Sequence, residues 1–148
     1  MSILWRNLAT GLLIVSASMI QSTNFLVVGG AKPNLVLAAL AVLAILNWPL
    51  IEYLTWMLVA AILLKFSPIL SWISVVFLIT AVKMFFINRF LPWSRYLSGI
   101  VVIISGTAVF YILGAPIFLY HQWPTVLLEL VYNVVVGVIL IMIWPKKD

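Results

Sequence analysis

Four ionisable residues lie within or beside long apolar stretches of this sequence, and they are the first candidates for chemistry. They are Glu52, Lys65, Lys83 and Glu129. A charged group in apolar surroundings is costly unless it is paired or hydrogen-bonded, so such groups often belong to a functional site. Each of the four therefore needs a partner, and the spacing of the sequence suggests candidates.

Glu52 and Lys83 are expected to form an ion pair. They lie on either side of Ser67-Pro68, where the chain is expected to turn, at nearly equal sequence distances from it. If both flanking segments are helices, a rise of about 1.5 Å per residue puts each charge roughly 22–24 Å from the turn. An antiparallel helix pair then brings the two charges to one depth. The alternative is that each side chain reaches separately to a polar surface.

Glu129, Asn133 and Gly137 recur at every fourth position near the end of the chain. Residues with this spacing lie on one face of a helix, and a glycine there allows a second helix to approach closely. Two interpretations remain open. The stripe can pack inside the chain, with Glu129 capped or paired to Lys65, or it can contact another protein.

Enzymatic chemistry has little support in the remaining residues. The single histidine, His121, could serve Ser105 as a base, but no acid is apparent that would orient it. The sequence has no cysteine, no phosphate-binding glycine loop and no motif of metal-ligating residues. We therefore expect a protein that is not an enzyme, with no catalytic, cofactor or metal site.

The composition indicates a protein that lies in a membrane. Of the 148 residues, 66% are hydrophobic and 7% are charged, whereas soluble domains contain roughly 25% charged residues. So few charges cannot cover a water-exposed surface, and lipid must therefore surround most of the chain. The net charge of +5 then relates to membrane orientation and lipid headgroups rather than to nucleic acid.

Prolines divide the chain into apolar segments that are expected to be helices. The expected fold is all-α, a single transmembrane domain over residues 1–148 with about six short helices at 7–28, 34–48, 50–66, 69–88, 96–119 and 125–144. A span needs about 20 apolar residues. Because the second and third segments are short, residues 34–66 form either two spans in a thinned bilayer or a re-entrant hairpin. Gly114-Ala115-Pro116 predicts a kink or a frayed end late in the fifth helix.

Basic residues predict the orientation of the bundle in the membrane. With six helices, most of these residues fall on one side and only two on the other. The first group is Arg6, Lys83, Arg89, Arg95, Lys146 and Lys147, and the second is Lys32 and Lys65. Because basic loops tend to stay in the cytoplasm, both termini are expected there, with Lys32 and His121 outside.

Two short strings resemble the MreD family of bacterial rod-shape-determining membrane proteins. Pro33-Asn34-Leu35-Val36-Leu37 resembles the Pro-Asp-Leu-rich start of that family's second helix, and Glu129-Leu130-Val131-Tyr132-Asn133 resembles its last helix with its asparagine. The chain length and the six-helix layout are also similar. The chain departs from the family at Asn34, where aspartate is usual, and at Lys65-Phe66-Ser67-Pro68, where a glycine-rich helix usually runs to an aspartate.

The resemblance implies a multi-pass protein of the bacterial plasma (inner) membrane that acts as a non-catalytic scaffold of the cell-shape and peptidoglycan-elongation complex, the rod complex. The implied partner, besides membrane lipids, is an MreC-like single-span protein. The family shares its fold with the substrate-binding S components of energy-coupling-factor vitamin transporters, which are one alternative. Those proteins dock through alanines spaced i and i+4 in the first helix, whereas this chain has Ala9 and Ala17 there. An unassigned small membrane scaffold is the other alternative.

Overall fold

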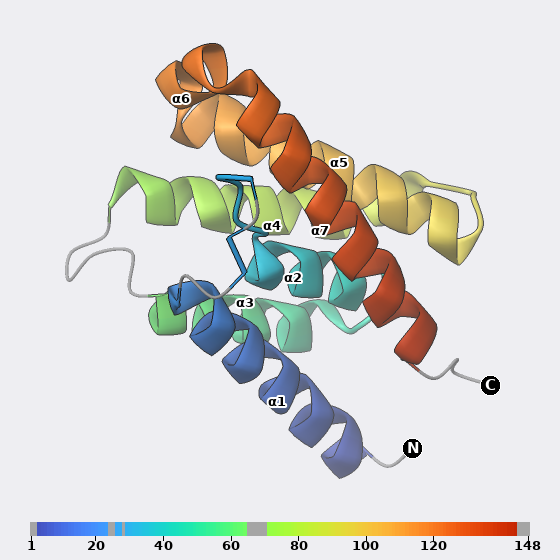
Figure 1. Cartoon of the computed structure of the whole chain (residues 1–148). Helices are drawn as coiled ribbons and strands as arrows, with labels where there is room; N and C mark the ends of the chain where they lie inside the picture. The colour runs from blue at the N-terminus through green and yellow to red at the C-terminus, as the bar shows by residue number, and fades with distance from the viewer. Residues whose placement is uncertain (1–2, 24–25, 28, 65–70, 145–148) are drawn as a thin grey trace.

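Helices account for almost all of the described chain, which covers residues 3–23, 26–27, 29–64 and 71–144 of this computed structural model. In chain order they are α1 (Ile3–Ser22), α2 (Leu35–Ile45), α3 (Leu50–Leu64), α4 (Trp72–Phe90), α5 (Arg95–Gly114), α6 (Pro116–His121) and α7 (Trp123–Ile143). Three helices begin at a side chain that accepts a hydrogen bond from the first turn: Asn34 for α2, Ser71 for α4 and Ser94 for α5. Such N-caps satisfy backbone N–H groups that have no partner within the helix. The predicted all-α helical bundle is confirmed (Figure 1).

The fifth predicted helix, 96–119, is divided in the structure. α5 ends at Gly114, and Pro116 begins the short helix α6. Proline lacks an N–H and disfavours a helical conformation at the residue before it. Ala115 accordingly has a φ of −146° and a ψ of 58°. The predicted kink is therefore a complete break, and the described residues form seven helices instead of about six.

The first predicted helix, 7–28, begins and ends earlier than expected. The hydroxyl groups of Ser22 and Thr23 donate to the carbonyl oxygens of Met19 and Ile20 at 2.7 and 2.8 Å, a local bond that competes with continuation of a helix. Further along, Gly29 and Gly30 have φ values of 61° and 80°. This left-handed conformation suits glycine and is incompatible with a right-handed helix at these two residues.

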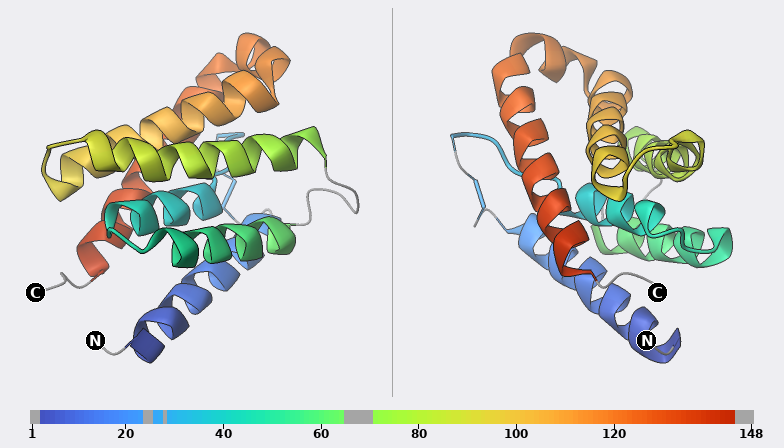
Figure 2. Two further views of the ribbon diagram at one scale, coloured as in Figure 1. Left: turned by 180° about the vertical axis from the view of Figure 1, so that it is seen from behind. Right: turned by 90° about the vertical axis from the view of Figure 1, so that its right-hand side faces the viewer.

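The second helix, α2, lies in the middle of the bundle. It packs against α1, α3, α4, α5 and α7, and every one of its residues is buried. Figure 2 shows α2 enclosed by the longer helices in both views. A helix that is hydrophobic on all sides is stable only in such a position. Its 11 residues extend about 16 Å, which is too short to cross the roughly 30 Å hydrocarbon core.

The third helix, α3, is also short but lies at the periphery of the bundle. Its 15 residues expose Ile51, Leu58 and Ile62. α2 is therefore enclosed by protein, as a re-entrant segment requires, while α3 turns an apolar face outward. By length and composition, α4, α5 and α7 are each long and apolar enough to cross a bilayer, which supports a membrane protein.

Both ends of the described chain lie at one end of the bundle, together with the α2–α3 turn and the α4–α5 loop (Figures 1 and 2). We call this the terminal end. Hydrogen bonds join its parts: Asn88 Nδ2 donates to the Ala44 carbonyl at 2.9 Å, and Arg95 Nη2 donates to the Ile141 carbonyl at 2.9 Å. These bonds connect α4 to α2 and α5 to α7, so the helices are held together at the terminal end.

α5 and α7 approach each other through a reciprocal glycine–isoleucine contact. A Cβ atom built on Gly137 of α7 would overlap Ile103 of α5, and one built on Gly99 of α5 would overlap Ile141 of α7. Each isoleucine follows the glycine of its own helix by one turn, so two antiparallel helices fit together twice by the same means. Missing side chains at these positions permit the short distance between the helices.

We predict that Gly137→Ala lowers the free energy of unfolding by about 1–3 kcal/mol, because the added methyl group must displace the buried side chain of Ile103. Gly114→Ala is the matched control, since its Cβ would meet Val76 Cγ1 at 3.5 Å, an ordinary contact. Denaturant unfolding of both purified variants in the same detergent measures the difference. Equal stabilities would contradict the close approach of α5 and α7.

Candidate functional site

The predicted stripe of Glu129, Asn133 and Gly137 lies on the inner face of α7. All three residues are buried in the bundle. Their common face is therefore confirmed, and the interpretation that they pack inside the chain is the one that the structure bears out. The competing interpretation, in which this stripe contacts another protein, is wrong for these three residues because other helices of the same chain already cover them.

Asn133 connects α7 to two other parts of the chain. Its Oδ1 accepts a hydrogen bond from the backbone N–H of Asn34 at 2.7 Å. Its Nδ2 donates to the hydroxyl oxygen of Thr107 on α5 at 3.1 Å. Asn133 and Thr107 are both buried, so one amide satisfies two buried polar groups that water does not reach.

The start of α2 is the point where these bonds converge. The first N–H groups of a helix lack partners within the helix, and inside an apolar bundle they need other acceptors. Asn34 Oδ1 accepts from the N–H of Leu37 at 3.1 Å, and Gln21 Oε1 of α1 accepts from the N–H of Val36 at 3.0 Å. Together with Asn133, three side chains from separate parts of the sequence satisfy this helix start. We call Gln21, Asn34, Thr107 and Asn133 the α2 start cluster.

Glu129 lies one turn before Asn133 on α7 and has a different partner. The hydroxyl of Tyr111, near the end of α5, donates to Glu129 Oε2. The Tyr111 ring in turn stacks on Phe118 of α6, with 6.0 Å between centroids and 23° between ring planes. This set of contacts holds the short helix α6 against the ends of α5 and α7. The predicted partner of Glu129, Lys65, lies outside the described residues.

The predicted ion pair between Glu52 and Lys83 is corrected by the structure. Glu52 Oε2 pairs with Arg6 Nη2 at 2.5 Å, and the guanidinium of Arg6 also lies over the Trp48 ring, 4.5 Å from its centroid. Lys83 is half-buried on α4. Counting residues from the turn estimates depth along a helix but not rotation around it. The start of α1 lies at the same depth as Glu52 and supplies the cation.

The hypothesis that His121 serves Ser105 as a base gains no support from the described contacts. The Ser105 hydroxyl donates to the carbonyl of Val102 at 3.0 Å. The exposed ring of His121 lies edge-on to Tyr120, with 5.2 Å between centroids. Among the described residues, the polar groups that gather inside the bundle therefore join helices to one another.

Sequence reasoning did not connect three members of these clusters with their partners. Gln21 was one of several polar residues near the end of the first helix, and nothing in its spacing distinguishes it from its neighbours. Thr107 and Tyr111 lie one turn apart in α5, opposite Asn133 and Glu129. That matched spacing of four on two apolar helices was a usable signal for pairing α5 with α7.

No protein-family model matches this chain, and neither a search of the curated proteins nor a search of the solved structures finds a match.

We predict that Asn133→Leu lowers the free energy of unfolding by about 1–3 kcal/mol for each buried polar group that it leaves without a partner. Thr107→Val removes only one of the two bonds that Asn133 makes, so its effect should be smaller. The double variant should be less destabilised than the sum of the single variants, because Thr107 is already unpaired in Asn133→Leu. Strict additivity in detergent unfolding would refute the shared hydrogen bond.

Proposed function

We propose that this chain is a non-catalytic, multi-pass scaffold subunit of the bacterial plasma membrane that helps to assemble the cell-shape and peptidoglycan-elongation complex. The proposal begins from the resemblance of two short strings to the MreD family. One observation carries it further. The N–H of Asn34 in the first string donates to Asn133 in the second, at 2.7 Å across 99 residues of sequence. The two strings therefore belong to a single structural unit.

The main departure from the family pattern is compatible with this unit. The family usually has aspartate where this chain has Asn34. Here the side chain of that residue caps α2 by accepting from the N–H of Leu37, and asparagine and aspartate are about equally good at this position. The substitution therefore keeps the capping function and changes only the charge. The second departure, at Lys65, lies outside the described residues.

The work of such a subunit would be done by the outer faces of its helices. Glu129 and Asn133 of α7 are buried against the chain's own helices, so they cannot recognise a partner directly. The opposite face of α7 exposes an apolar stripe at every fourth position: Leu127, Val131, Val135 and Ile139. We propose that the single transmembrane helix of an MreC-like partner packs along this stripe, which continues the segment that carries the resemblance.

The proposed orientation has both termini in the cytoplasm. Arg6, Arg89 and Arg95 all lie at the terminal end, as their contacts with Glu52, Phe85 and the end of α7 indicate. Lys32 precedes α2 at the opposite end. This asymmetry is the one on which the positive-inside rule depends.

Cysteine labelling tests the orientation, and the chain has no native cysteine to interfere. Gln122→Cys lies in the exposed α6–α7 connection, and Pro92→Cys lies in the exposed α4–α5 loop. In intact cells an impermeant maleimide should modify the cysteine at 122 and not the one at 92. Labelling at 92 with protection at 122 would reverse the proposed orientation.

Deletion and partner recovery test the function. Loss of this protein should round rod-shaped host cells that have no second copy. Ile139→Trp, on the α7 stripe, should reduce recovery of the MreC-like partner about fivefold or more, because a misfit of at least about 1 kcal/mol is expected from an added bulky ring. Ile79→Trp on α4 is the matched control, since both isoleucines are 48% exposed.

Normal cell shape after clean deletion would contradict the proposal. In that case the vitamin-transporter alternative predicts a small molecule that co-purifies with the chain. Equal loss of partner in both tryptophan variants would instead remove the α7 stripe from the proposal. Glu129 and Asn133 are unsuitable for these tests, because changing buried residues alters stability before it alters recognition.

A further inference from the structure

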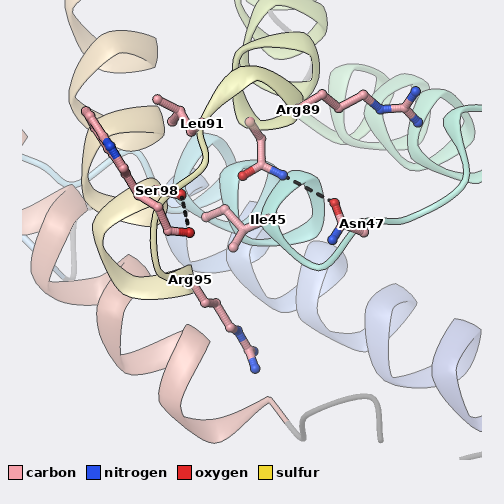
Figure 3. Close-up of a pocket in the computed structure, with 8 residues that line it drawn as sticks. Ile45, Asn47, Arg89, Leu91, Arg95 and Ser98 are labelled. Carbon is pink, nitrogen blue, oxygen red and sulfur yellow. Dashed lines mark hydrogen bonds between the residues drawn. The ribbon is translucent and has the colours of Figure 1, made fainter.

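The terminal end of the bundle contains a cavity of about 480 Å³. It lies among the α2–α3 turn, the end of α4, the α4–α5 loop and the start of α5 (Figure 3). The polar side chains that line it are Asn47, Asn88, Arg89, Arg95 and Ser98. The α2 start cluster lies at the other end of α2, so this cavity is a separate feature of the fold.

The cavity is cationic, and no carboxylate of the described residues lines it. Arg89 and Arg95 both contribute to its wall. The chain has three acidic residues in all. Glu52 is paired with Arg6, Glu129 accepts from Tyr111, and Asp148 lies outside the described residues. Two arginines without an acidic neighbour in the lining favour an anionic ligand.

Arg95 is held by two hydrogen bonds, and one of its other donors is buried without a partner. Its Nη2 donates to the carbonyl oxygens of Ile141 and Trp144 at 2.9 and 3.1 Å. Its Nε is buried and has no hydrogen-bond partner among the described residues. A buried N–H without an acceptor is uncommon in folded proteins. An anionic oxygen in the cavity would supply that acceptor once the atoms that cover Nε move aside.

The second arginine, Arg89, is exposed and comes from a different element. Its guanidinium lies over the Phe85 ring, 4.5 Å from the centroid, and in Figure 3 it extends away from Arg95. The side chain can turn toward the cavity mouth by a change of rotamer at the cost of that cation–π contact. Arg95 would then form the fixed wall of the site and Arg89 its adjustable side.

The rest of the cavity matches an amphipathic ligand. Ile45, Leu91 and Trp93 add an apolar portion to its lining, and Trp93 is 53% exposed. Tryptophan is typical of the level of the lipid headgroups. The arginines of the cavity match a charged headgroup, and its apolar side, which includes Trp93, matches the start of an acyl chain.

We propose that this cavity binds the phosphate group of an anionic phospholipid. Arginine presents paired N–H donors that match phosphate oxygens. The amides of Asn47 and Asn88 line the same cavity. Basic pockets between membrane helices bind anionic headgroups in this way. The proposal requires neither the scaffold function nor any protein partner.

Native mass spectrometry of the purified chain in detergent tests the site. Phosphatidylglycerol should bind about fivefold or more tightly than phosphatidylcholine with the same acyl chains, since each basic residue near the surface contributes about 1 kcal/mol. Arg89→Gln should lower phosphatidylglycerol binding by about fivefold, and Arg95→Gln should lower it as well. Lys32→Gln, which removes one charge at the opposite end, is the matched control and should leave binding unchanged.

Arg95→Gln also removes two hydrogen bonds to the end of α7, so the thermal unfolding of this variant is measured together with its lipid binding. If Arg95→Gln is unstable, the binding of Arg89→Gln decides the outcome. Equal binding of the two lipids, or an equal loss in Lys32→Gln and Arg89→Gln, would overturn the site. Glycerol 3-phosphate distinguishes the source of the phosphate. If glycerol 3-phosphate displaces the lipid only at far higher concentrations, the ligand is a lipid. If glycerol 3-phosphate binds as tightly as the lipid does, the proposal that the phosphate belongs to a membrane lipid is overturned.

Discussion

The buried start of α2 is the constraint on which the rest of this bundle depends. A helix that begins inside an apolar bundle has N–H groups that neither water nor the helix itself can satisfy, and each unpaired group costs several kcal/mol in such surroundings. Three acceptors meet this need: Asn34 beside the helix, Gln21 from α1 and Asn133 from α7. Because the acceptors come from distant parts of the chain, satisfying α2 also fixes where α1 and α7 lie.

The remaining helices follow from that placement. Asn133 extends the connection to α5 through Thr107, and the paired contacts of Gly137 with Ile103 and of Gly99 with Ile141 let α5 and α7 approach closely. Hydrogen bonds supply the register between these helices, and the missing side chains supply the space. Polar groups alone would hold α5 at a distance, and glycines alone would allow it to slide along α7. The combination specifies one arrangement of two otherwise apolar helices.

The sequence indicated where helices lie along the chain and which residues share a helix face, but it was less informative about how each helix is rotated about its axis. The segments 69–88 and 125–144 were predicted close to α4 (Trp72–Phe90) and α7 (Trp123–Ile143), because prolines mark those boundaries. The common face of Glu129, Asn133 and Gly137 followed from their spacing. The Glu52–Lys83 pair failed because depth along a helix says nothing of the direction in which a side chain points. The break at Ala115 and the early end of α1 at Ser22 depend on backbone conformations at single residues, which hydrophobic pattern does not report.

This use of polar residues changes how motifs in such a chain are best interpreted. A membrane bundle has few polar side chains, and a resemblance between sequences naturally rests on them. In this chain Asn34 and Asn133 join α7 to the start of α2, so a string containing them identifies an architecture before it identifies a partner. The two surfaces proposed for recognition are less distinctive in composition: the apolar outer face of α7 and the arginine-lined cavity at the terminal end. Sequences that keep the internal asparagines can therefore share this fold while differing in what they bind, because the residues that define the fold and the proposed partner surface lie on opposite faces of α7.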